Sequence, residues 1–215
     1  MKDYLNKDLL IRAIVAFIGC VAIAFGISLS GTIDMGMDPY SAMNMGISAL
    51  TGIRFGTVVV IFNVFIFLAV VFVDRSQFGL GTLINWFFVG YIVEFFDFFF
   101  NQAGLGDGDM NLLIRVVLTV IAGTIFLFGA SLYISAGIGT APLDAIAPTV
   151  EEKSKFSYAQ VRFAHEILCL LMALLLGGPV GLMTVYLGFF AGPMISTFRA
   201  KLAEPIVNKL TGSKI

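Results

Sequence analysis

The chain has 215 residues, of which 59% are hydrophobic and only 13% charged, with a mean hydropathy of +0.97. Soluble domains carry roughly 25% charged residues, so this composition excludes an ordinary soluble protein and indicates one that resides in a membrane. The net charge of −1 gives no reason to expect a nucleic-acid partner. Both cysteines, Cys20 and Cys169, fall inside apolar runs, which argues against a disulfide framework.

Several apolar runs reach the roughly 20 residues that a helix needs to cross a bilayer. The first begins after basic residues, as a signal peptide would, but it is too long for one and its pattern recurs in mid-chain. We therefore expect a single all-α membrane domain over residues 1–215, with a C-terminal tail at 201–215. Six spans are predicted, at about 9–33, 56–73, 79–101, 112–136, 157–177 and 179–198.

The second half of the chain repeats the first. Residues 25–29 (Phe-Gly-Ile-Ser-Leu) match 128–132 (Phe-Gly-Ala-Ser-Leu), and the separation of 103 residues slips to 101 or 102 further along. Repeat 1 covers about 9–101 and repeat 2 about 112–200. Three spans per repeat is an odd number, so the halves would insert in opposite directions and form a 3+3 inverted repeat.

The basic residues predict the orientation, because short cytoplasmic loops are enriched in Lys and Arg. Six spans with both termini in the cytoplasm keep most basic residues inside, with Arg54 as the exception. The loop that holds Asp107 and Asp109 then lies outside. An alternative with eight spans gives a parallel repeat and moves Arg75 outside, so the charges favour six.

A Gly-x-x-Pro segment follows the first and the fourth span. The first copy holds Asp38, Pro39 and Ser41, and the second holds Pro142 and Asp144. Proline suits the first position of a helix and Asp38 suits an N-cap, so each segment predicts a turn followed by a short helix. Two hypotheses follow. Either the broken or re-entrant helices face a central site with their partly positive N-termini, or the segments are interfacial turns.

The fifth span carries Arg162 and Glu166, which share a helix face because they are four residues apart. Glu166 should lie roughly 15 Å from the charged loop at Lys155, near the middle of the membrane. Charge at that depth indicates either a functional site or an internal ion pair that locks the span in place. His165 points elsewhere and is expected to be structural.

Other polar residues inside the spans are secondary candidates. Asn63 and Asn85 are amides in mid-span, which are expected to hydrogen-bond across helices, and Asn63 is also a candidate solute contact. Glu94 could face the interior and pair with Arg115 or Arg12. The alternative for these two arginines is that they extend toward the lipid headgroups.

A set of short motifs runs along the chain: 36–41, 51–52, 55–56 and 79–85 in the first half, and 139–144, Arg162 with Glu166, 177–181 and 192–193 in the second. In this order they resemble the YczE/YyaS/YitT family of bacterial integral membrane proteins, over about residues 10–200. Met183 and His165 depart from the family's pattern. The resemblance implies a multi-pass protein of the bacterial inner membrane, and it implies no substrate.

The expected function is transport of an unidentified small solute, by alternating exposure of a central site between the two repeats. The alternative is an accessory membrane protein that supports a biosynthetic, sensing or secretion complex without transporting anything. Enzyme, phosphate-loop, cofactor and metal motifs are missing, so we expect no enzymatic activity, cofactor or metal. Expected partners are the lipid bilayer and the solute, and a homodimer is compatible with the sequence. The candidate solute-binding residues are Asp38, Pro39, Ser41, Asn63, Pro142, Asp144, Arg162 and Glu166.

Overall fold

The computed structural model describes residues 2–53, 55–105 and 110–212, so Arg54, Asp107 and Asp109 lie outside the described residues. No strand occurs within those ranges, and the all-α expectation is confirmed. Among the described residues, four helices are long and apolar enough to cross a membrane: the Lys7–Thr32 part of α1, α4, α5 and α7. The helices are α1 (Lys2–Thr32), α2 (Pro39–Thr51), α3 (Phe55–Val73), α4 (Leu80–Gln102), α5 (Leu112–Ser135), α6 (Pro142–Lys153), α7 (Tyr158–Leu175), α8 (Leu182–Phe198) and α9 (Glu204–Thr211), with short turns η1 (Arg75–Gln77) and η2 (Arg199–Ala203).

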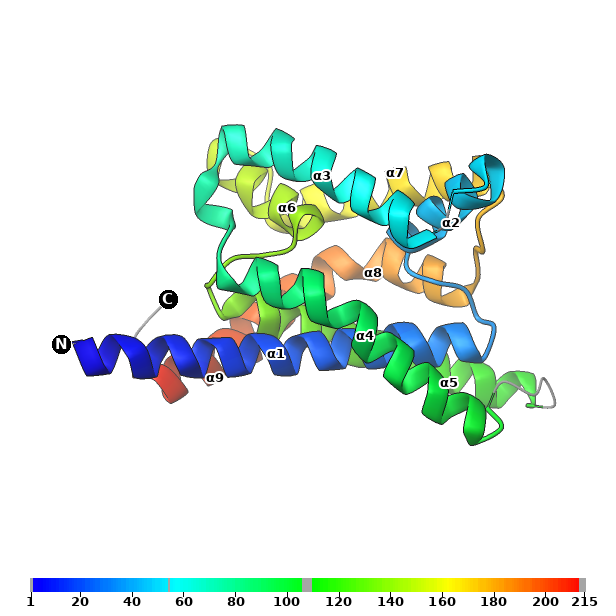
Figure 1. Ribbon diagram of the computed structural model, residues 1–215, viewed down its shortest axis with the longest axis horizontal. Coiled ribbons are helices and arrows are strands. Elements are labelled where there is room, and N and C mark those ends of the chain that lie inside the picture. The colour runs from blue at the N-terminus through cyan, green and yellow to red at the C-terminus, as the bar shows by residue number, and fades with distance from the viewer. Residues whose placement is uncertain (1, 54, 106–109, 213–215) are drawn as a thin grey trace.

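The helices form two layers that are joined by α8 (Figure 1). One layer holds α1, α4, α5 and α9, and the other holds α2, α3, α6 and α7. The start of α1 and helix α9 lie at the same end of the molecule in this view. Residues 199–211 are helical, and Ala203 and Val207 are fully buried in the core around α1, α5 and α8.

Helices α1 and α5, which occupy equivalent places in the two sequence repeats, make the most extensive contact in the molecule. Gly19 lies against the backbone of Gly129, and Gly26 against that of Ala122. The partner number on α5 falls as the number on α1 rises, so the two helices run antiparallel. Glycines at these positions let the backbones approach closely, as is common between helices in membranes.

Two arginines secure the ends of this helix pair. Nη1 of Arg12 donates to the carbonyl oxygen of Ala136 at 3.0 Å, and Nε of Arg115 donates to that of Ile33 at 2.8 Å. Each guanidinium therefore neutralises the partly negative C-terminus of the opposite helix. The hypothesis that one of them could pair with Glu94 is wrong, because both are engaged elsewhere and the Glu94 side chain is exposed.

The two helix breaks are stabilised by backbone hydrogen bonds from the other half of the chain. The N–H of Gly81, in the first turn of α4, donates to the carbonyl of Ile138 at 2.7 Å. Its counterpart Met183, in the first turn of α8, donates to the carbonyl of Met35 at 2.9 Å. These bonds pair helix N-terminal donors with irregular-loop acceptors, and an apolar environment requires both kinds of group to be satisfied.

Gly36 and Gly139 make these exchanges possible. Their φ angles are +87° and +102°, and each lies against the backbone of another glycine: Gly181 beside Gly36, and Gly79 beside Gly139. A side chain at either position would meet backbone atoms that cannot move without breaking the exchanged bonds.

We expect Gly36→Ala and Gly139→Ala each to lower the thermal stability of the purified protein, because the new Cβ strains the left-handed backbone and collides with the facing glycine. Strain of this kind costs about 1–3 kcal/mol before the collision is counted. Gly90→Ala on α4 is the matched control, since its position is open and helical. Thermal unfolding in detergent measures all three, and melting temperatures that equal the control for both variants would contradict this role.

Candidate functional site

The proline segments fold as the sequence predicts, as short helices after a break. Pro39 begins α2, and Asp38 is its N-cap, with Oδ1 accepting the N–H of Ser41 at 3.0 Å. Pro142 begins α6 and Asp144 lies in the first turn, while the N-cap Ala141 has no side chain to contribute a bond. Both prolines are fully buried, so the starts of α2 and α6 lie inside the protein.

An ionic cluster lies at the start of α6. Nη1 of Arg162 donates to Oδ1 of Asp144 at 2.5 Å, and Nε of Arg162 lies 2.7 Å from Oε1 of Glu166. Arg162 is 5% exposed and Glu166 3%, so both charges are inside the protein. The prediction that Arg162 and Glu166 share a helix face is confirmed. Buried charges are stable only when paired in this way.

Asp38 adds a third carboxylate to this region from the other half of the chain. It interacts electrostatically with both Arg162 and Glu166. Its Oδ2 atom is buried and has no hydrogen-bond partner among the residues that the structure describes. Two carboxylates, those of Asp144 and Glu166, therefore contact the guanidinium directly. Asp38 interacts with it electrostatically and keeps one oxygen unsatisfied.

Three further polar residues surround this cluster. The hydroxyl of Tyr40 donates to Oδ1 of Asn63 at 3.2 Å, which connects α2 to α3. Asn44 is fully buried and donates to the carbonyl of Tyr40 at 2.8 Å. The Tyr158 hydroxyl is buried without a partner within the described ranges. Sequence reasoning missed all three, although Tyr158 lies four residues before Arg162 on the same helix face.

The secondary candidates lie elsewhere. Nδ2 of Asn85 contacts Sγ of Cys20 at 3.8 Å, and this contact joins α4 to α1, as expected for a bond across helices. Arg115 caps the end of α1, and Glu94 is exposed on α4. The His165 ring contacts Cys169 at 3.5 Å. The candidates that come together are thus Asp38, Asp144, Arg162 and Glu166. The other four candidates position helices: Pro39 and Pro142 begin α2 and α6, Ser41 binds the N-cap Asp38, and Asn63 joins α3 to α2.

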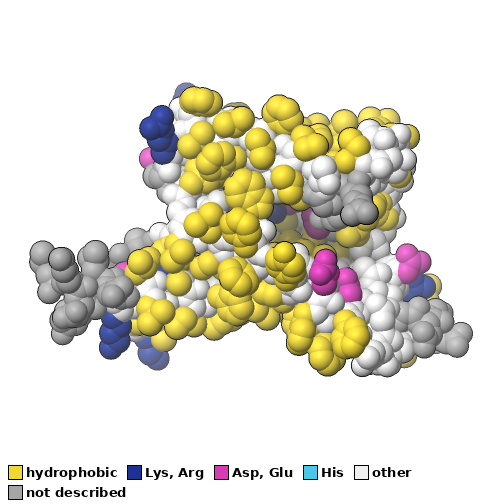
Figure 2. All heavy atoms as spheres, in the orientation of Figure 1, with side chains coloured by type: hydrophobic (Ala, Val, Ile, Leu, Met, Phe, Trp, Pro, Cys, Tyr) yellow, Lys and Arg dark blue, Asp and Glu magenta, His cyan; other side chains and the backbone are white. Residues whose placement is uncertain are grey.

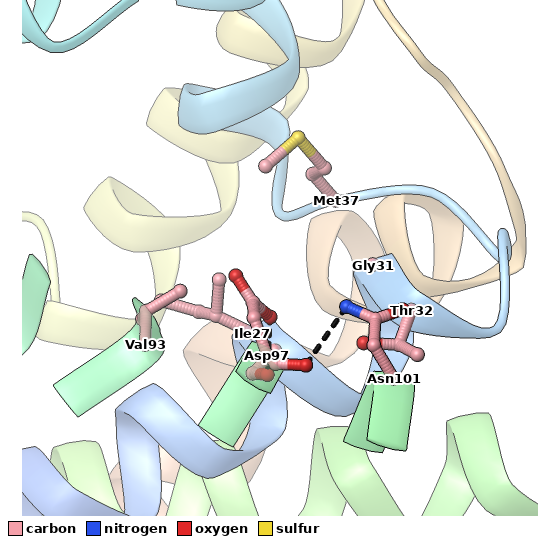
Figure 3. A pocket seen from close by; sticks show the side chains of 8 residues that line it. Ile27, Gly31, Thr32, Met37, Val93, Asp97 and Asn101 are labelled. Atoms are coloured by element: carbon pink, nitrogen blue, oxygen red, sulfur yellow. Dashed lines mark hydrogen bonds between the residues drawn. The ribbon is translucent and has the colours of Figure 1, made fainter. Parts of the chain in front are cut away.

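A pocket of about 370 Å³ lies beside the Asp38 segment, between α1 and α4 (Figure 3). The hydroxyl of Ser28 donates to Oδ1 of Asp97 there, and Met37 lies across the space from Asp97. Volumes of 300–1,000 Å³ are typical of small-molecule sites. The lining residues are Ile27, Ser28, Gly31, Thr32, Met37, Val93, Asp97 and Asn101.

The pocket lies where the two halves of the chain differ. Helices α7 and α8 pack closely, whereas their counterparts α3 and α4 make little contact apart from the rings of Phe67 and Trp86. Figure 2 shows this face hollowed between α3 and α4, with charged side chains at the base of the hollow. Acidic side chains lie on the edge of the hollow over α4, the helix that carries Glu94 and Asp97.

The equivalent region of the second half is closed. Each of the eight pocket residues has a counterpart 102 or 103 residues later in the chain. Seven of these counterparts are at most 7% exposed. Oγ of Ser131 there donates to the carbonyl of Ile195 at 3.3 Å, which joins α5 to α8. The counterpart of Asp97 is Arg199. The seven buried residues are Ala130, Ser131, Ile134, Ser135, Thr140, Ile195 and Ala203.

The model of a family of unknown function, DUF6198, matches residues 10–200. The chain belongs to this family. It is 26% identical over 191 residues to the uncharacterized membrane protein YczE of Bacillus subtilis (strain 168), covering 87% of this chain and 85% of YczE. It is 22% identical over 192 residues to YyaS of the same organism, covering 89% of this chain and 94% of YyaS.

An uncharacterized protein of Haemophilus influenzae is 28% identical over 175 residues, covering 80% of this chain and 74% of the relative. No solved structure matches the chain. The predicted resemblance to YczE and YyaS is therefore confirmed, and with it the conclusion that this is a membrane protein.

Arg162→Gln should destabilise this DUF6198 protein, because it leaves Asp144 and Glu166 buried without a counter-charge. Removing one member of a buried ion pair costs about 3–5 kcal/mol. Glu166→Gln should cost less, since Arg162 keeps its bond to Asp144. Thermal unfolding of the purified variants tests the order.

Lys201→Gln is the control for this series, because the Lys201 side chain is exposed and its loss should cost less than about 0.5 kcal/mol. An Arg162→Gln variant as stable as Lys201→Gln would show that the cluster contributes nothing to the fold.

Proposed function

We propose that this protein transports a small solute across the bacterial inner membrane by alternating access. In this proposal α1, α3, α4, α5, α7 and α8 are six spans arranged as a 3+3 inverted repeat, with both termini in the cytoplasm. The solute site lies between the tips of α2 and α6, at Asp38, Asp144, Arg162 and Glu166.

The helix directions support this arrangement. Helix α1 is antiparallel to its equivalent α5, as two oppositely inserted copies require. Helix α4 runs parallel to α1, because Phe17 packs on Phe88 and Phe25 on Phe96. Such a pair is expected when one further span, α3, lies between them in the chain. The start of α1 and helix α9 lie at one end of the molecule, which also fits an even number of spans (Figure 1).

The observation that carries the proposal is the difference between the two halves. A pocket is open between α1 and α4, while the equivalent residues of α5 and α8 are buried. Two copies of one unit in two states are what alternating access needs, because exchanging the states exposes the site to the other side. With the N-terminus inside, the open pocket faces outward.

Contacts on the closed side support a second, inward-facing state. The Arg199 guanidinium lies 5.1 Å from the centre of the Tyr158 ring and pairs with Glu204 at 3.5 Å. These contacts join α7, η2 and α9 over the closed region. Tyr158 is buried, whereas Arg199 and Glu204 are partly exposed, and the single salt bridge between them is weak enough to break when the inner side opens.

Cysteine labelling tests the alternation. In a Cys20→Ala, Cys169→Ala background, Thr32→Cys lies in the open pocket, and Ser135→Cys is its buried counterpart, 2% exposed. We expect a membrane-impermeant thiol reagent to label Thr32→Cys from outside and Ser135→Cys only from inside and more slowly. A solute that shifts the protein inward should slow the first reaction and speed the second.

Labelling of both positions from the same side would contradict the inverted arrangement. An accessory protein that only supports a partner complex predicts a Ser135→Cys rate that no solute changes. It also predicts no solute flux in reconstituted vesicles.

A further inference from the structure

The pocket and the ionic cluster share one electrostatic property. The only ionisable side chain among the eight pocket residues is Asp97. Beyond Met37, the next residue is Asp38, followed by Asp144 and Glu166 around Arg162. The pocket and the ionic cluster, which adjoin at Met37 and Asp38, therefore hold four carboxylates and one guanidinium.

Two other arginines have acidic partners of their own. Arg12 binds Asp8 and the end of α5, while Arg115 binds the end of α1 and lies 3.7 Å from the Asp34 carboxylate. A region with more carboxylates than guanidinium groups and with apolar walls concentrates ligands of positive charge. The unsatisfied Oδ2 of Asp38 supplies a buried acceptor beside the pocket. An oxygen atom in that position is unfavourable until a donor or a cation reaches it.

The walls indicate the kind of cation. Ile27, Met37 and Val93 line the pocket together with hydroxyl and amide groups, and the volume of about 370 Å³ far exceeds that of a single ion. Mixed apolar and polar linings are typical of organic ligands. Methionine in particular adapts its shape to varied apolar groups.

We propose that the site takes an organic cation, whose ammonium group pairs first with Asp97 and then with Asp38, and whose apolar body lies against Ile27, Met37 and Val93. This names the substrate class of the proposed transport site and rests on that proposed function. The ion pair of Arg162 with Asp144 and Glu166 then remains intact on binding, and Asp38 carries the charge that the cation neutralises.

The test is a binding measurement on the full chain in detergent, independent of transport. The probes are benzyltrimethylammonium, benzenesulfonate as an anion of similar size, and benzyl alcohol as a neutral compound. Trp86, the only tryptophan, lies on α4 beside the hollow and packs on Phe67, so its fluorescence reports binding locally. Calorimetry gives the dissociation constants.

We expect benzyltrimethylammonium to bind with a millimolar or lower dissociation constant. The other two probes should bind at least about tenfold more weakly. Asp97→Asn and Asp38→Asn should each weaken ammonium binding about tenfold or more, as the loss of a charged partner does. Asparagine still accepts the Ser28 hydroxyl at position 97 and still caps α2 at position 38, so both variants should fold. Glu152→Gln, an exposed residue at the end of α6, is the matched charge control and should bind normally.

The inference is overturned if benzenesulfonate or benzyl alcohol binds as tightly as the ammonium probe. It is equally overturned if the ammonium does not bind at millimolar concentration, or if neither aspartate variant changes its affinity. Flux of an anionic solute in vesicles would reject the cation site and leave transport standing. A cation that binds but never crosses would reject transport and leave the site standing.

Discussion

Irregular backbone in an apolar surrounding must have its polar groups satisfied, and this constraint determines how the two halves of the molecule meet. The chain breaks before α2 and again before α6. The carbonyl groups at the breaks are bound by the first turns of α8 and α4, through Met183 and Gly81. Because each break depends on the other half of the chain, neither repeat is complete alone. The short helices consequently begin in the interior, at Pro39 and Pro142, and the ionic cluster forms where they begin.

Much of this fold follows from the sequence. Apolar runs long enough to span a bilayer predict the long helices, and proline with an aspartate before it predicts the start of α2. Spacing along one helix predicts the pair of Arg162 and Glu166. These are local patterns, and local patterns survive folding because lipid removes most alternatives to the helix.

Other features of the site depend on partners that no local pattern reveals. Asp144 reaches Arg162 from a different helix, and Tyr40 reaches Asn63 across α2 and α3. The expected pairing of Glu94 with Arg12 or Arg115 is wrong because both guanidinium groups bind carbonyl groups at helix ends. Every residue has a backbone carbonyl, so no residue type in the sequence marks such a partner. The packing of Val207 into the core is likewise invisible in a polar C-terminal segment. An alignment of the two repeats does not predict that α7 and α8 pack closely while α3 and α4 do not, because equivalent sequences do not say which copy is open.

The central claim is that the open and closed halves exchange states. Spin labels at Val60 and Phe98 report the α3–α4 separation. Labels at Gln160 on α7 and at Ala200 in η2, directly after α8, report the separation of α7 from the end of α8. All four side chains are exposed. Pulsed electron paramagnetic resonance in lipid nanodiscs measures both distance distributions. The account predicts two populations of distances for each pair. A solute condition that shortens the α3–α4 distance should lengthen the α7–α8 distance. A single unchanging distance for both pairs, in every solute condition, would contradict it.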